Sequence, residues 1–135
     1  MRIVLDTNVL VSGIFFSGPP SEILKAWRDG EVKLVLTPAI IDEYVRVARI
    51  LADKFSGIKI TPILTLIIAN SDIIHPPPFP NEICEDPDDD KFLACALASE
   101  SSPIVSGDKH LLKLSGFRGL NILTPRAFTE QYLKK

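Results

Sequence analysis

The sequence predicts one α/β domain with three layers, in which helices cover both faces of a parallel sheet. Short apolar segments alternate with amphipathic segments along the 135 residues, a pattern typical of parallel strands joined by right-handed helical crossovers. Apolar residues make up 46% of the chain and charged residues 24%, as in folded globular proteins. Neither half alone supplies enough strands and helices to close a sheet, so we expect a single domain over residues 1–135.

The first half is expected to begin with a strand, a loop, a helix and a second strand. Residues 3–5 are apolar and mostly β-branched, as in a buried strand. Residues 12–21 contain two glycines and two prolines, which favours a loop, and Ser21 is expected to cap a helix ending near Gly30. The second strand is expected at residues 32–36.

Threonine followed by proline marks the expected starts of three helices, because threonine caps a helix well and proline suits its first position. These starts are Thr37-Pro38, Thr61-Pro62 and Thr124-Pro125. On the first of these helices an apolar stripe runs from residue 40 to residue 51, and Glu43 lies along its edge. Glu43 is therefore the acid of that helix that can lean over the sheet.

The second half repeats the alternation of strands and helices. Brief strands are expected at residues 72–74, 104–105 and 121–123, and residues 75–80 carry four prolines, which exclude a helix there. Further helices are expected at residues 92–98 and 109–114, and from Pro125 through Phe128 and Tyr132. On a helical wheel Leu93, Ala94, Leu97 and Ala98 form the inward stripe of the first of these, with Asp90 in its middle.

Four acidic residues are expected to meet at the carboxyl edge of the sheet. Asp6 follows the first strand and Asp108 follows the strand at residues 104–105, and in a parallel sheet these ends share one edge. Asp90 lies at a helix start, and Glu43 lies in the first turns after its own strand, so both face the same edge. Helix capping explains Asp6 taken alone, but it does not explain the convergence of all four acids.

Such a group of carboxylates points to a divalent cation. Without basic partners they repel one another and raise the pKa of at least one member unless a cation is bound. Oxygen ligands without histidine or cysteine select Mg²⁺ or Mn²⁺, whose fitting chemistry here is phosphodiester hydrolysis. Asp6 and Asp108 would hold the ion, and Asp90 would bind it directly or through water. Glu43 would hold a second ion or position the attacking water.

Other polar residues are expected to support this site. Asn8 and Ser106 would orient the ligands, or alternatively serve as turn or cap residues. Because the net charge is −2, a nucleic-acid partner would need local positive charge. Lys91, Lys109 and His110 are candidates for contacts with phosphate, and solvated surface is the alternative for each.

The cysteines and histidines predict no zinc site. Cys84 and Cys95 are too far apart for a Cys-x-x-Cys motif, and His75 and His110 are isolated. Cys95 lies among small apolar residues and is expected in the core.

These motifs together resemble the PIN domain family, in particular the branch that contains toxins of toxin–antitoxin pairs. The likeness covers essentially the whole chain and rests on Asp6-Thr7-Asn8, Glu43 after Thr37-Pro38, Asp88-Asp89-Asp90 and Ile104-Val105-Ser106-Gly107-Asp108. It implies a sheet of about five parallel strands, a Mg²⁺- or Mn²⁺-dependent endoribonuclease acting on single-stranded RNA, an antitoxin partner and a homodimer. The family's acidic quartet would fall on Asp6, Glu43, Asp90 and Asp108, with Asp88 as the next candidate within the aspartate run.

Three other functions compete with this one. A haloacid dehalogenase-like phosphatase also begins with a strand ending in aspartate, but it needs an acid two residues later, where this chain has Asn8. A receiver domain needs paired acids after its first strand and a phosphoacceptor aspartate after its third, and residues 72–75 do not supply the latter well. The non-enzyme alternative is a PIN-like scaffold that binds RNA or protein with weak or no nuclease activity, which would have no reason to keep four repelling acids.

The apolar segments do not predict a membrane protein. An acid already stands at position 6, which leaves no room for a signal peptide, and the longest apolar run, residues 63–69, is too short to span a bilayer. We therefore expect a cytoplasmic protein without a membrane partner.

Overall fold

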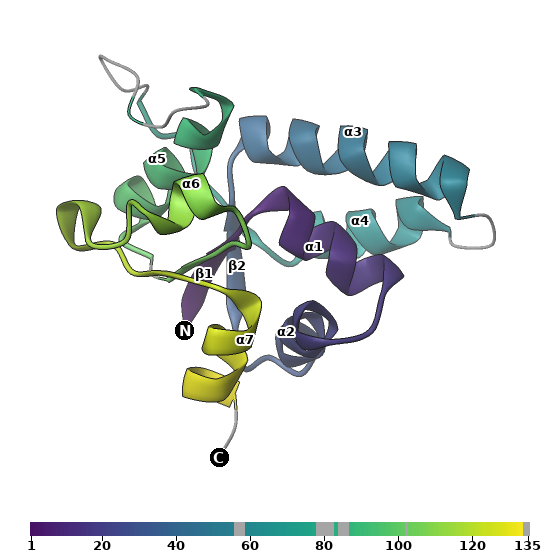
Figure 1. Cartoon of the computed structure of the whole chain (residues 1–135). Helices are drawn as coiled ribbons and strands as arrows, with labels where there is room; N and C mark the ends of the chain where they lie inside the picture. Colours follow the sequence, from purple (N-terminus) through teal and green to yellow (C-terminus); the bar gives the residue numbers. More distant parts are fainter. Residues whose placement is uncertain (56–58, 78–82, 84–86, 102, 134–135) are drawn as a thin grey trace.

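The chain folds around a five-stranded parallel sheet with the strand order β3-β2-β1-β4-β5 (Figure 1). The computed structural model describes residues 1–55, 59–77, 83, 87–101 and 103–133. The strands are β1 (Arg2–Leu5), β2 (Lys33–Leu36), β3 (Asp72–Ile73), β4 (Ile104–Val105) and β5 (Ile122–Leu123). The predicted parallel α/β sheet is confirmed, and each strand lies within one residue of its expected bounds.

Helices cover both faces of this sheet, which confirms the three layers. Figure 1 shows α1 to α4 on one side of the strands and α5 and α6 on the other. The α-helices are α1 (Thr7–Phe15), α2 (Pro19–Arg28), α3 (Pro38–Lys54), α4 (Ile60–Ala69), α5 (Asp90–Ser99), α6 (Lys109–Leu112) and α7 (Pro125–Phe128). Two short 3₁₀ helices are η1 (Pro87–Asp89) and η2 (Phe117–Gly119), and α7 continues as a π-helical turn, η3 (Thr129–Leu133).

The loop predicted for residues 12–21 is wrong, because α1 continues through Gly13 to Phe15. A Cβ atom on Gly13 would lie 2.7 Å from the backbone oxygen of Pro20, so the glycine permits close packing of α1 against α2. Gly18 then turns the chain with a φ of 123°, and Pro19 stands at the start of α2. Ser21 consequently lies inside α2 and does not cap it.

Two of the three expected threonine caps are confirmed. The Thr37 hydroxyl accepts a hydrogen bond from the Ile40 N–H at 3.2 Å, and Thr124 accepts one from Ala127 at 3.1 Å. The third is wrong, because α4 begins one residue earlier, at Ile60, and Thr61 lies in its first turn. The helix after β4 also ends two residues before the expected position.

The inward stripe predicted for α5 is partly wrong. The helix buries Phe92, Leu93, Cys95, Ala96 and Ser99, whereas Ala98 is exposed and Asp90 is only half-buried. In a segment made almost entirely of small apolar residues the periodicity is ambiguous, and the contacts of the larger Phe92 with the core set the rotation. Asp90 therefore does not lie in the middle of the buried face.

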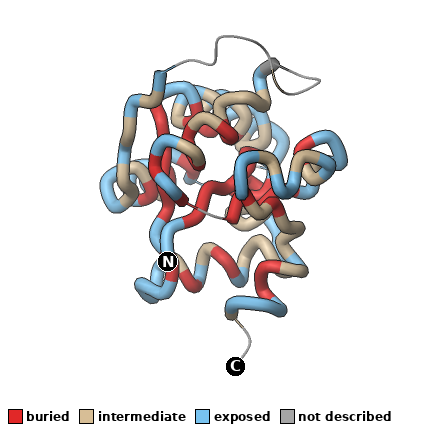
Figure 2. The backbone as a smooth tube through the Cα atoms, turned by 90° about the vertical axis from the view of Figure 1, so that its left-hand side faces the viewer, coloured by how far each residue is buried: buried red, intermediate tan, exposed pale blue. Residues whose placement is uncertain are grey.

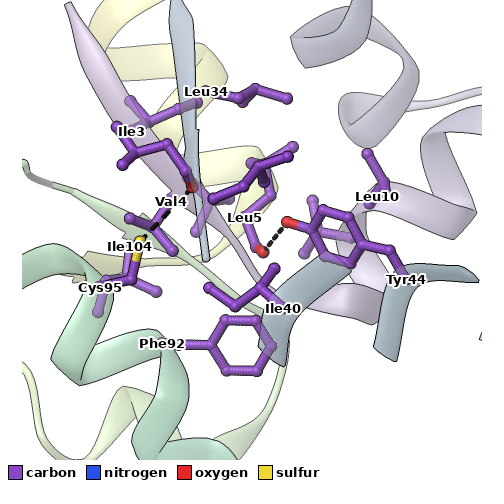
Figure 3. Close-up of a cluster of buried hydrophobic side chains, with 14 of the residues drawn as sticks. Ile3, Val4, Leu5, Leu10, Leu34, Ile40, Tyr44, Phe92, Cys95 and Ile104 are labelled. Atoms are coloured by element: carbon purple, nitrogen blue, oxygen red, sulfur yellow. Dashed lines mark hydrogen bonds between the residues drawn. The ribbon is translucent and has the colours of Figure 1, made fainter. Parts of the chain in front are cut away.

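The core fills the space between the sheet and the helices. Buried residues follow the strands and the inner sides of the helices (Figure 2). Figure 3 shows Tyr44 of α3 beside Leu5 at the end of β1, and Phe92 of α5 in the same cluster. The Cys95 thiol is fully buried and donates to the Val35 carbonyl at 3.6 Å, which confirms its place in the core. Within the described residues, no helix combines the length and apolar character that a membrane span requires.

Candidate functional site

The candidate site lies where β1 and β4 end side by side. Leu5 and Val105 are paired in the parallel register, and the Asp6 N–H donates to the Val105 carbonyl at 2.9 Å. Asp6 immediately follows β1, while Ser106 and Asp108 follow β4. The sheet thus brings Asp6 and Asp108 to one edge, as the parallel topology predicts.

A buried hydrogen-bond chain fixes the orientation of Asp6. The Ser106 hydroxyl donates to Oδ2 of Asp6 at 2.7 Å and accepts the backbone N–H of Asp108 at 3.0 Å. Ser106 is fully buried, and Asp6 is 6% exposed. Asp6 stands at the N-cap position of α1, and its side chain makes no capping hydrogen bond with the described residues, which include the whole helix. Capping therefore does not explain this carboxylate.

Burial raises the pKa of Asp6 above its usual value, because the charged form loses its hydration. The hydrogen bonds from Ser106 and from the backbone of Thr7 act in the opposite direction and lower the pKa. The negative charges of Glu43 and Asp108 raise it further, so these two carboxylates lie close enough to act on Asp6. Their mutual repulsion is what the sequence predicts for converging acids.

Glu43 occupies a different environment, in which both carboxylate oxygens have partners. Oε1 accepts a hydrogen bond from Nζ of Lys91 at 2.6 Å, and Oε2 accepts one from the Thr7 hydroxyl. Arg46 lies 3.9 Å from Oε1 but is 65% exposed. Burial raises the pKa of Glu43, yet the opposing effects of Lys91, Thr7 and Arg46 outweigh it, and the net pKa is lowered. The expectation that the carboxylates have no basic partner is therefore wrong for Glu43.

Tyr44 attaches α3 to the end of β1. Its hydroxyl is buried and donates to the Leu5 carbonyl at 2.5 Å, immediately before Asp6 (Figure 3). Together with the Thr7–Glu43 bond, this contact fixes the position of Glu43 relative to Asp6. The sequence indicates Tyr44 only as part of the apolar stripe over residues 40–51 and predicts no separate role for Thr7, although an aspartate–threonine pair at a strand end was a signal available for the latter.

Asp108 also has a structural role. It is the N-cap residue of α6, and its Oδ1 accepts the backbone N–H of His110 at 2.9 Å. Lys109 and His110 are exposed beside it.

Asp90 is the first residue of α5, and its side chain contacts a residue seven positions earlier in the chain. Its Oδ2 accepts the backbone N–H of Ile83 at 3.0 Å. Asp88 is exposed in η1, and Asp89 stands at the N-cap position of α5 without a capping hydrogen bond from the described residues. Asn8 is exposed on α1. The roles expected for Asp90, Asp88 and Asn8 stay predictions, and Cys84, Glu85 and Asp86 lie outside the described residues.

The donor chemistry at Asp6 and Asp108 fits a hard divalent cation. In the described part of the chain, neither residue forms an ion pair with a basic side chain. The same part contains no ready-made group of three acidic, histidine or cysteine side chains that could hold a metal. Mg²⁺ needs no such group, because it commonly binds one or two carboxylates and keeps several waters.

Comparison with known proteins agrees with this arrangement. Residues 2–110 match the family model of the PIN domain, a range that includes Asp6, Glu43, Lys91 and Asp108. No individual curated protein matches the chain significantly. PIN domains are generally nucleases. The sheet order, the acids at its carboxyl edge and a match over most of the sequence place this chain in the PIN domain family.

Proposed function

We propose that the protein is a Mg²⁺- or Mn²⁺-dependent endoribonuclease that hydrolyses phosphodiester bonds of single-stranded RNA. The observation that carries this proposal is the environment of Asp6, a buried carboxylate at the sheet edge. The negative charges of Glu43 and Asp108 repel it, and it has no basic partner in the described part of the chain. A fold has no stabilising use for such a charge, whereas a cation-binding hydrolase needs it.

Each residue has a distinct role in this proposal. Asp6 and Asp108 hold the cation from the strand ends, and Asp90 binds directly or through water. Ser106 keeps Asp6 in one orientation through its 2.7 Å hydrogen bond. Glu43 faces the same edge, where it positions the attacking water or holds a second ion. When bound, the cation supplies a more acidic water and offsets negative charge on the phosphate.

The RNA backbone would be recognised by basic groups beside the acids. Lys109 and His110 are exposed directly after Asp108, so they can reach phosphates from the edge of the site. The net charge of −2 excludes a general basic surface, so binding depends on these local contacts and weakens as salt concentration rises. Asn8, which is exposed two residues after Asp6, is a further candidate for orienting groups at the site.

The test is cleavage of an unstructured RNA oligonucleotide by the purified protein. Wild type should cleave with Mn²⁺ or Mg²⁺ and stop on addition of EDTA, and Asp6→Asn should be inactive but folded. Asp42→Asn is the matched control, because Asp42 is an exposed acid beside Glu43 on α3. Full activity of Asp6→Asn, or cleavage that ignores EDTA, would contradict the proposal. Binding of RNA without cleavage would instead favour an RNA-binding scaffold.

We further propose that the protein is the toxin of a toxin–antitoxin pair, acts as a homodimer and works in the cytoplasm. The support is the resemblance of its motifs to that branch of the family. Expression of the wild-type chain, but not of Asp6→Asn, should arrest growth of a bacterial host. Light scattering of the purified protein should give twice the mass of the 14.9 kDa chain. Unaffected growth at full expression would contradict the toxin role.

A further inference from the structure

The carboxylates near the sheet edge fall into two electrostatic classes. Asp6 and Asp108 form no ion pair with a basic side chain of the described residues, whereas Glu43 has a lysine at contact distance. A cation supplied from solution is therefore needed at the first two residues. At Glu43 the protein already supplies one.

The Lys91–Glu43 pair is built to persist. The two side chains are only 17% and 15% exposed, and their N···O distance is 2.6 Å. Solvent screens such a pair far less than a surface pair. The pair also joins α3 to α5 across 48 residues, and Oε2 of Glu43 is separately occupied by the Thr7 hydroxyl. Arg46 is farther away and mostly exposed, so it cannot replace Lys91.

We propose that Lys91 is an internal cation that takes the place of a second metal ion, and that Glu43 is not a metal ligand. The site then binds one divalent ion, which Asp6, Asp108 and, directly or through water, Asp90 would hold. This inference rests on the proposed metal-dependent function. Lys91 is then a positioning residue, which holds Glu43 toward the edge where water and substrate meet. Removal of the Lys91 charge should leave a partly buried carboxylate whose remaining basic neighbour among the described residues is the mostly exposed Arg46, at 3.9 Å, and a second cation can then bind there.

The test is Mn²⁺ titration by calorimetry, which reports stoichiometry and affinity without depending on catalysis. Wild type should bind one ion, Lys91→Gln two, and Lys91→Arg one. In the charge-neutral double variant Glu43→Gln/Lys91→Gln the stoichiometry should return to one, with the affinity of that ion unchanged. Lys25→Gln is the matched control, because it removes one positive charge from an exposed position on α2. Circular dichroism melts verify that each variant is folded.

The outcomes separate this inference from the function on which it rests. Two ions in wild type, or one ion in folded Lys91→Gln, would overturn the internal-cation role and leave metal-dependent hydrolysis intact. A loss of the single ion in the double variant would show that Glu43 is a ligand and overturn the inference even if Lys91→Gln does not fold. No binding of Mn²⁺ to wild type would overturn both.

Discussion

Replacing Ser106 by alanine tests whether the buried hydrogen-bond chain orients Asp6. The substitution removes the donor to Oδ2 of Asp6 and the acceptor of the Asp108 N–H, and it changes little else because serine and alanine differ by one oxygen. We expect Ser106→Ala to lower both the free energy of unfolding and the rate of RNA cleavage.

The magnitude follows from the charge of the acceptor. A buried hydrogen bond to an ionised group contributes about 1.5–3 kcal/mol, so we expect a loss of about 2 kcal/mol in the free energy of unfolding. For a chain of this length that loss corresponds to a fall in Tm of about 7 °C. Loss of a residue that orients a metal ligand lowers metal affinity or activity by about 10- to 100-fold.

The deficit should depend on pH. The Ser106 hydrogen bond lowers the pKa of Asp6, so it stabilises the ionised carboxylate more than the protonated one. This stabilisation is present above the folded-state pKa of Asp6 and diminishes as pH falls through it. The difference in unfolding free energy between wild type and Ser106→Ala should therefore be larger at neutral pH than in acid.

The assay is urea denaturation at both pH values, with RNA cleavage measured at neutral pH. Ser99→Ala is the control, because Ser99 is also buried but its hydroxyl donates only to the carbonyls of Cys95 and Ala96 in its own helix. Such a bond adds little to stability. Equal stability and activity of Ser106→Ala and wild type would refute the orienting role, as would equal losses in the two serine variants.

Three further changes test the site and its surroundings. Burial raises the pKa of Asp6, so protonation of this carboxyl stabilises the fold in acid, and that stability is lost as pH rises through the folded-state pKa. Asp6→Asn should therefore melt no lower than wild type at neutral pH, while it loses cleavage. A clear fall in its Tm would contradict this. Gly13→Ala should lower the unfolding free energy by about 1–3 kcal/mol in urea melts, since its Cβ would press on the Pro20 backbone; an unchanged midpoint would refute the packing argument. Burial raises the pKa of the Cys95 thiol to about 12, so peptide mapping should find it unalkylated by iodoacetamide until denaturant is added, and rapid labelling of the native protein would contradict its core position.

The sheet was predictable because its signals are local. Each strand is a short apolar run, and parallel pairing then determines that Asp6 and Asp108 share an edge. The start of α2 was not predictable from the same signals. Gly13 and Pro19 are typical helix breakers in sequence. In the structure Gly13 permits a close contact with residues seven or more positions later, and Pro19 is the first residue of α2.

The environment of Glu43 could not be predicted for a related reason. Whether Lys91 reaches Glu43 depends on the rotation of α5 about its axis, and residues 93–98 are apolar on every side. The rotation is set by packing of Phe92 and Cys95 against the sheet, which no periodicity in the segment reveals. The sequence therefore indicates Lys91 only as a phosphate contact or as solvated surface, although its ion pair lies within the protein.

Three hydrogen bonds at the sheet edge serve stability and site geometry together. The Tyr44 hydroxyl donates to the carbonyl of the residue before Asp6. Thr7, the residue after Asp6, donates to the Glu43 carboxylate, and Ser106 donates to Asp6 itself. Each bond joins elements that are distant in sequence, and each ends on a carboxylate or on the residue next to one. The acids can therefore lose their fixed positions only through a motion that separates β1 from α3 or β4, and such a motion also breaks bonds that hold the fold. The edge can hold repelling charges in fixed positions because the bonds that orient them also hold the layers together.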